Sequence, residues 1–118
     1  MGGTNLNKYL PLSEATFYIL VALVEPLHGY GVMQKIEAMS GGKISVGPGT
    51  LYGAFTTLEA EKLIVMHGQE DRRKYYVLTE KGRAVLRAQI ERLEMMVRCG
   101  QEALGAHDAG YSAGTDGG

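Results

Sequence analysis

The apolar positions in the first quarter of the chain form an almost unbroken run. All residues from Phe17 to Val24 are hydrophobic or aromatic, and the run lies between Ser13 and Pro26. Serine is a favoured N-cap and proline disfavours helical geometry at the residue before it, so we expect a helix that begins near Ser13 and stops before Pro26. A helix without a polar face in so small a domain needs a second surface to cover it. We interpret that surface as a partner subunit, contacted by Phe17 and Leu20.

Helical spacing of apolar residues predicts two further helices. The first opens at His28, which we interpret as a turn residue, and ends at Gly41-Gly42. The second starts at Gly47-Pro48, because proline suits the first turn of a helix. Residues 44–46 between them are compatible with one short strand. The second of these helices has three inward residues, Leu51, Phe55 and Leu58, and directs Thr50, Tyr52, Gly53, Thr56 and Thr57 elsewhere.

The second half of the chain predicts a hairpin and a long helix. Two β-rich runs, 64–68 and 73–78, flank the polar turn 69–72. Thr79 can cap a helix from about Glu80, and apolar residues recur on it at alternating spacings of four and three, the pattern of a helix-on-helix seam. The residues of this seam are Leu86, Ile90, Leu93, Val97, Gly100 and Leu104. This helix also looks like an interface, and after it the Gly, Ala and Ser content rises.

This order of elements predicts a mainly α-helical fold with a small β-hairpin. It is the order of a winged helix-turn-helix DNA-binding domain followed by a long C-terminal dimerisation helix. With 118 residues the chain has room for one domain. We expect a flexible leader over 1–11, the winged domain over 12–79, the dimerisation helix over 80–104 and a disordered tail over 105–118.

Several classes of protein are poorly supported by the composition. The longest apolar run is far shorter than the roughly 20 residues of a membrane span, and no basic leader precedes it, so we expect a cytoplasmic protein without a membrane partner. Cys99 is the only cysteine, and the three histidines lie in different elements at no metal-ligand spacing. No nucleophile has a nearby base, and the glycine-rich pieces do not match a phosphate loop. We therefore expect no enzyme activity, no cofactor and no metal.

The distribution of charge favours a nucleic-acid partner more than the net charge of -1 does. Between residues 72 and 98 there are eight basic residues against three acidic ones. Three of them, Arg72, Arg73 and Lys74, lie at or beside the hairpin turn, where cations can grip a phosphate backbone without burial. Thr50 and Tyr52 lie near the start of a helix that fits a major groove about 12 Å wide. The alternative is that the turn and the exposed Thr and Tyr side chains are simply solvated.

Five motifs together resemble the PadR family of bacterial transcriptional regulators. They are Leu27-His28-Gly29-Tyr30-Gly31, Pro48-Gly49-Thr50-Leu51-Tyr52, Leu58-Glu59, Leu63-Ile64, and Arg72-Arg73-Lys74-Tyr75-Tyr76-Val77-Leu78-Thr79 with Gly82. The likeness runs from about residue 12 to residue 104. It implies a homodimer that binds a pseudo-palindromic operator in double-stranded DNA and acts as a repressor, often relieved by a small hydrophobic or aromatic effector. The single helix after the wing is similar to the shorter class of the family.

The resemblance also implies which residues form the sites. By position, Thr50, Tyr52 and Thr56 would lie at the DNA, Tyr30 and Lys35 near its backbone, and Arg72, Arg73 and Lys74 on the wing. Effector pocket and dimer interface would include Phe17, Leu20, Leu93, Met96 and Val97.

Two features depart from the family. Thr56-Thr57 stands where members commonly carry Lys or Arg, which weakens the phosphate grip, and no tryptophan is present to stack on a drug. Met95 and Met96 could line an adaptable pocket or only pack the interface. The alternative function is a winged-helix protein-interaction module without DNA binding.

Overall fold

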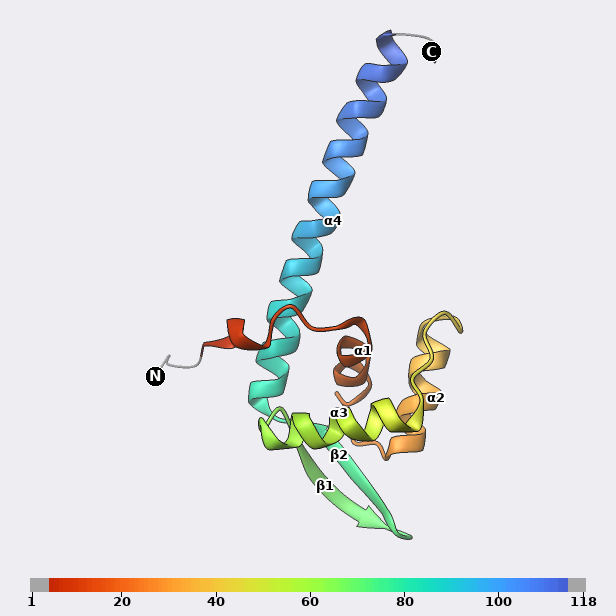
Figure 1. The fold of residues 1–118 in the computed structure, drawn as a ribbon, viewed down its shortest axis with the longest axis vertical. Helices are drawn as coiled ribbons and strands as arrows, with labels where there is room; N and C mark the ends of the chain where they lie inside the picture. Colours follow the sequence, from red (N-terminus) through yellow and green to blue (C-terminus); the bar gives the residue numbers. More distant parts are fainter. Residues whose placement is uncertain (1–4, 115–118) are drawn as a thin grey trace.

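The structure, a computed structural model, describes residues 5–114 and confirms the predicted fold class. It is mainly helical, with one two-stranded antiparallel hairpin and a long last helix (Figure 1). The elements in chain order are the 3-10 helix η1 (Leu6–Tyr9), α1 (Glu14–Ala22), α2 (Gly29–Met39), α3 (Pro48–Ala60), β1 (Ile64–Glu70), β2 (Arg73–Leu78) and α4 (Glu80–Gly114).

Helix α1 lies at the centre of the core. As predicted, Ser13 is its N-cap, and the serine hydroxyl accepts from the backbone N–H of Thr16 at 3.1 Å. Ile19, Leu20 and Leu23 are fully buried within the single chain. The predicted role of Leu20 at a subunit interface is therefore wrong, because α2 and α4 of the same subunit pack around α1 and cover most of its apolar surface.

Helices α2 and α3 begin at the residues that the sequence predicts. Gly47 is the N-cap of α3 and a proline follows at its start, while Gly41 and Gly42 close α2 with φ values of 65° and 80°. The short strand expected over 44–46 is wrong. The backbone N–H of Ile44 donates to the Ser40 hydroxyl at 2.9 Å, so the polar groups here pair with a side chain and not with a second strand.

The hairpin has a tight turn at its tip. Residues pair from Ile64 opposite Leu78 to Glu70 opposite Arg73, with an irregularity between Met66 and Gly68. The two turn residues between the strands, 71 and 72, have φ values of 49° and 67°, as the mirror-image turns of two-residue hairpins require. At its other end the hairpin is joined to the α1–α2 loop by a bridge between residues 27 and 76.

Helix α4 begins in the core and then leaves it. Its first turns bury Val85, Leu86 and Gln89. With 35 residues it is about 52 Å long, and its second half projects away from the body, opposite to the hairpin (Figure 1). The predicted end near Leu104 is wrong, since the helix runs to Gly114: no proline interrupts residues 105–114. The rest of the predicted tail, 115–118, lies outside the described residues.

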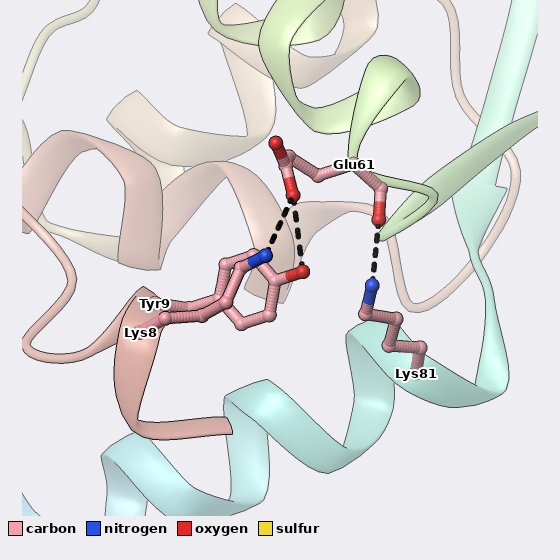
Figure 2. Close-up of polar contacts among 4 residues, drawn as sticks. All are labelled: Lys8, Tyr9, Glu61 and Lys81. Carbon is pink, nitrogen blue, oxygen red and sulfur yellow. Dashed lines mark hydrogen bonds and ion pairs between the residues drawn. The ribbon is translucent and has the colours of Figure 1, made fainter. Parts of the chain in front are cut away.

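The segment before α1 packs on the domain and does not form the predicted flexible leader. The Tyr9 hydroxyl donates to a carboxylate oxygen of Glu61 at 3.0 Å, and Lys81 donates to the Glu61 backbone carbonyl at 3.1 Å (Figure 2). The backbone N–H of Leu12 donates to the buried side chain of Gln89 at 2.8 Å. These bonds join the N-terminal segment to the end of α3 and to α4. Residues 1–4 of the predicted leader lie outside the described part.

Candidate nucleic-acid interface

A concave surface lies between the start of α2, the outer face of α3 and the hairpin turn. Its volume is about 430 Å³, and we call it the basic cleft. It is lined by His28, Gly29, Tyr30, Tyr52, Phe55, Thr56, Glu59, Arg72, Arg73, Lys74 and Tyr76. Six of the eight residues predicted to bind DNA are in this set, although they come from three separate parts of the sequence. The fold therefore places α3, the helix predicted to enter the DNA groove, and the cations of the hairpin turn on one surface.

Two predicted DNA-binding residues do not line the cleft. Thr50 is exposed in the first turn of α3, where helix N–H groups have no partner within the helix. Lys35 is half-buried on α2. Thr50 is thus exposed near the start of α3, whereas Lys35 does not line the cleft with the other predicted cations.

Aromatic rings connect α3 to the wing beneath the cleft. Tyr52, which is 51% exposed, meets Phe55 edge to face with 5.9 Å between ring centroids. Phe55 in turn lies 5.0 Å from the ring of Tyr76 on β2. Of the two neighbouring tyrosines on that strand, Tyr76 packs against the core and Tyr75 meets the ring of His28. This series of rings joins α3 to the hairpin.

The glycine that opens α2 is required by this arrangement. A Cβ atom added to Gly29 would lie 2.6 Å from Cζ and 2.9 Å from Cε1 of Tyr52. Real Cβ atoms do not approach a ring so closely, so only glycine lets the Tyr52 ring lie across the start of α2. Two of the sequence motifs, 27–31 and 48–52, are therefore two sides of one contact.

The cleft combines three exposed cations with one carboxylate. Arg72, Arg73 and Lys74 are exposed on the wing, and Glu59 faces them from α3. Burial raises the pKa of the Tyr76 hydroxyl above its usual 10.0, and the negative charge of Glu59 raises it further. The surface is basic in balance, but Glu59 reduces its attraction for an anion.

Sequence reasoning missed five residues of the cleft, among them two with polar groups that matter for its charge and hydrogen bonding, His28 and Glu59. Both are distant along the chain from the wing residues that they face. Glu59 directly follows Leu58, which the sequence predicts to face inward on α3. The Glu59 carboxylate reaches the cleft only because α3 packs close to β2. No sequence spacing reports that closeness.

A second surface lies between α1 and the projecting half of α4. This groove, which we call the α4 groove, brings together three residues of the predicted interface: Phe17, Leu93 and Val97. Its other lining residues are Ile90, Glu94, Arg98 and Gln101. Met96 is 65% exposed but does not line the groove. Beyond the turns of α4 that pack on the core, the apolar seam of this helix is therefore largely exposed in the single chain.

Neither a cluster of metal ligands nor a membrane-spanning helix is found among the described residues. Among them, no group of three His, Cys, Asp or Glu residues is arranged to hold a metal ion. Every helix within residues 5–114 falls short of the length or hydropathy needed to cross a membrane.

Comparison with known proteins connects this arrangement to a family. The model of the Transcriptional regulator PadR-like family matches residues 18–88. The chain is 40% identical over 75 residues to an uncharacterized 37.1 kDa protein in transposon TN4556 of Streptomyces fradiae, covering 63% of this chain and 21% of that protein. It is 29% identical over 96 residues to the transcriptional regulator YqjI of Escherichia coli (strain K12), covering 80% of this chain and 46% of YqjI. The chain spans less than half the length of these curated relatives.

The fold of a solved family member agrees with that match. The crystal structure of a PadR family transcriptional regulator from Eggerthella lenta superposes with a TM-score of 0.63 at 27% sequence identity. The superposition covers 76% of this chain and 77% of the other.

Proposed function

Because the chain belongs to the PadR-like family of transcriptional regulators, whose members are not enzymes, we propose that it is a homodimeric repressor that binds double-stranded DNA through the basic cleft. The observation that carries the proposal is the position of the wing cations. Arg72, Arg73 and Lys74 line the same concave surface as Tyr52 and Thr56 of α3. A helix that enters the major groove would thus have cations beside it, at the height of the phosphate backbone.

The α4 groove supports the dimeric part of the proposal. Val97 and Leu104 remain 55% and 65% exposed in the single chain, on the half of α4 that projects away from the body (Figure 1). A second copy of α4 would cover this seam, as in other paired helices. The two α3 helices, which we call the recognition helices, would then face a pseudo-palindromic operator about 34 Å apart. We place this action in the cytoplasm, with no membrane partner.

The groove is also where a small hydrophobic or aromatic effector would act. Its lining combines the aromatic ring of Phe17 and the aliphatic side chains of Leu93 and Val97 with the charged ends of Glu94 and Arg98. Such a surface suits a flat apolar molecule with one polar edge. A molecule bound there would relieve repression only by favouring one separation of the two recognition helices over another.

Fluorescence anisotropy on labelled DNA from the protein's own promoter tests the DNA-binding proposal. If the three wing cations of each subunit neutralise phosphates, the dimer makes six such contacts, and log affinity falls with log salt at a slope of about -5. Replacing all three cations with Ala abolishes most of that slope. Arg92, exposed on α4 away from the cleft, is the control, and Arg92→Ala leaves the slope unchanged. Binding that does not depend on salt would contradict the proposal.

One observation favours a second candidate, a winged-helix module that recruits a protein partner and does not bind DNA. Glu59 lies within the cleft, and the pair Thr56-Thr57 adds no positive charge to α3. In that case the triple Ala variant of the wing keeps its regulatory activity in cells. Loss of regulation together with loss of DNA binding decides for the repressor.

A further inference from the structure

The imidazole of His28 is held in one orientation from two sides. As the N-cap of α2, it accepts through Nδ1 a hydrogen bond from the backbone N–H of Gly31 at 3.2 Å. Its ring also meets the ring of Tyr75 edge to face, with centroids 5.2 Å apart and an interplanar angle of 90°. The second ring nitrogen, Nε2, is therefore directed to a fixed place in the basic cleft.

In the tautomer that accepts the bond from Gly31, the second nitrogen carries the proton. A neutral imidazole has one N–H, and because Nδ1 accepts the bond from Gly31, the hydrogen lies on Nε2. Across the cleft, Nη1 of Arg73 lies 3.3 Å from Nε2. A guanidinium group has five donors and no acceptor. Two N–H donors thus face one another, and neither can satisfy the other.

We propose that His28 Nε2 and the Arg73 guanidinium together donate to one phosphate oxygen of the DNA backbone. This inference rests on the proposed function. A phosphate oxygen has enough lone pairs to accept from both groups. Its negative charge is also attracted by the positive charge of the guanidinium. The charged groups that share the cleft are Arg72 and Lys74 on the wing and Glu59 on α3. Their balance is positive, so an anion fits the gap better than a cation does.

The shared phosphate gives His28 a positioning role at the DNA. His28 is the N-cap of α2, and Arg73 is the first residue of β2. One phosphate held by both would fix the wing relative to the helix-turn-helix unit. Contacts of this kind set the register of the protein on the duplex without reading its sequence.

A double-mutant cycle on a labelled, mixed-sequence DNA duplex tests this pair. His28→Ser keeps a side-chain cap for α2 but cannot reach the phosphate, and we expect it to lower affinity at least about tenfold, the effect of one hydrogen bond to a charged group. The double variant with Arg73→Ala loses less affinity than the product of the two single losses, because each single change removes the same phosphate contact. Combining it with Lys74→Ala, the matched control, multiplies the losses. The variant His28→Asn repeats the cycle with a second residue that is favoured as an N-cap.

Duplexes with a neutral methylphosphonate at single positions provide the second measurement. At the shared phosphate, the neutral group removes the difference between wild type and His28→Ser, while at other phosphates the difference persists. Unchanged affinity of His28→Ser, or losses that multiply with Arg73→Ala, overturns the shared phosphate and leaves the repressor proposal standing. If the wild-type protein shows no salt-dependent DNA binding, both fail.

Discussion

Replacing Gly29 with Ala should move Tyr52 out of the cleft. The new Cβ atom would lie 2.6 Å from the ring carbon Cζ, so the ring must turn away. Tyr52 is 51% exposed and has solvent to turn into, which keeps the cost small. The main loss is the edge-to-face pair with Phe55, and we expect the free energy of unfolding to fall by about 1 kcal/mol. For a chain of this length, that lowers Tm by roughly 4 °C.

The assay is thermal and urea unfolding in a cycle with Tyr52→Ala. In that background the ring is absent, so Gly29→Ala should cost nothing or stabilise slightly through better helix propensity. Gly31→Ala is the matched control in the same helix turn, because its added Cβ would meet Leu27 at an ordinary 3.4 Å. We expect it to change stability by less than about 0.5 kcal/mol in either background.

DNA binding provides the functional half of this prediction. A displaced Tyr52 ring no longer covers the floor of the cleft, so Gly29→Ala lowers affinity about as much as Tyr52→Ala does, and the two changes together lower it no further. The reasoning is refuted if Gly29→Ala costs the same stability with and without the ring. The loss would then arise from the backbone of α2.

Three further predictions follow from other contacts. Val97→Glu puts a charge in the α4 groove and should give a monomer in analytical ultracentrifugation, whereas Met96→Glu, beside it but outside the groove, should leave a dimer. Glu59→Gln removes the carboxylate of the cleft and should raise DNA affinity severalfold at low salt, with a smaller gain at high salt; a loss of affinity would show that Glu59 binds the DNA. Tyr9→Phe should lower the free energy of unfolding by about 1 kcal/mol in urea titration, because its hydroxyl bonds a carboxylate, whereas Lys8→Gln, whose ion pair is exposed and 3.8 Å long, should change it by less than about 0.5 kcal/mol.

The sequence predicted the elements well because their signals are local. Caps, prolines and apolar periodicity act within a few residues, and they located α1 at Ser13, α3 at Pro48 and the start of α4 at Glu80. The same reasoning failed where distant contacts decide. It interpreted Leu20 as part of an interface, although a helix that is apolar all round can be covered by its own subunit.

The prediction for the N-terminal segment failed for a related reason. Polar residues and a proline before α1 are typical of a flexible leader. The Tyr9 hydroxyl, however, donates to Glu61, fifty-two positions away, and this bond holds the segment on the domain. Six of the residues predicted to bind DNA line one cleft, and the sequence could name them because the helix and the wing each carry their own local signal. His28 was assigned to a turn, which was correct as far as its cap of α2 goes; its second nitrogen acquires a role only when β2 folds back beside it.

The junction between α3 and α4 determines how a signal from the α4 groove would reach DNA. The Thr79 hydroxyl donates to the carbonyl of Lys62 at 2.7 Å, and Lys81 donates to the carbonyl of the C-cap residue of α3 at 3.1 Å. Gly82 lies so close to the carbonyl of Leu63 that a Cβ atom there would clash with it. These contacts join the start of α4 to the end of α3, so we expect α4 and α3 to move as one body. An effector that changes the angle between two α4 helices would therefore change the separation of the two clefts and leave each cleft intact.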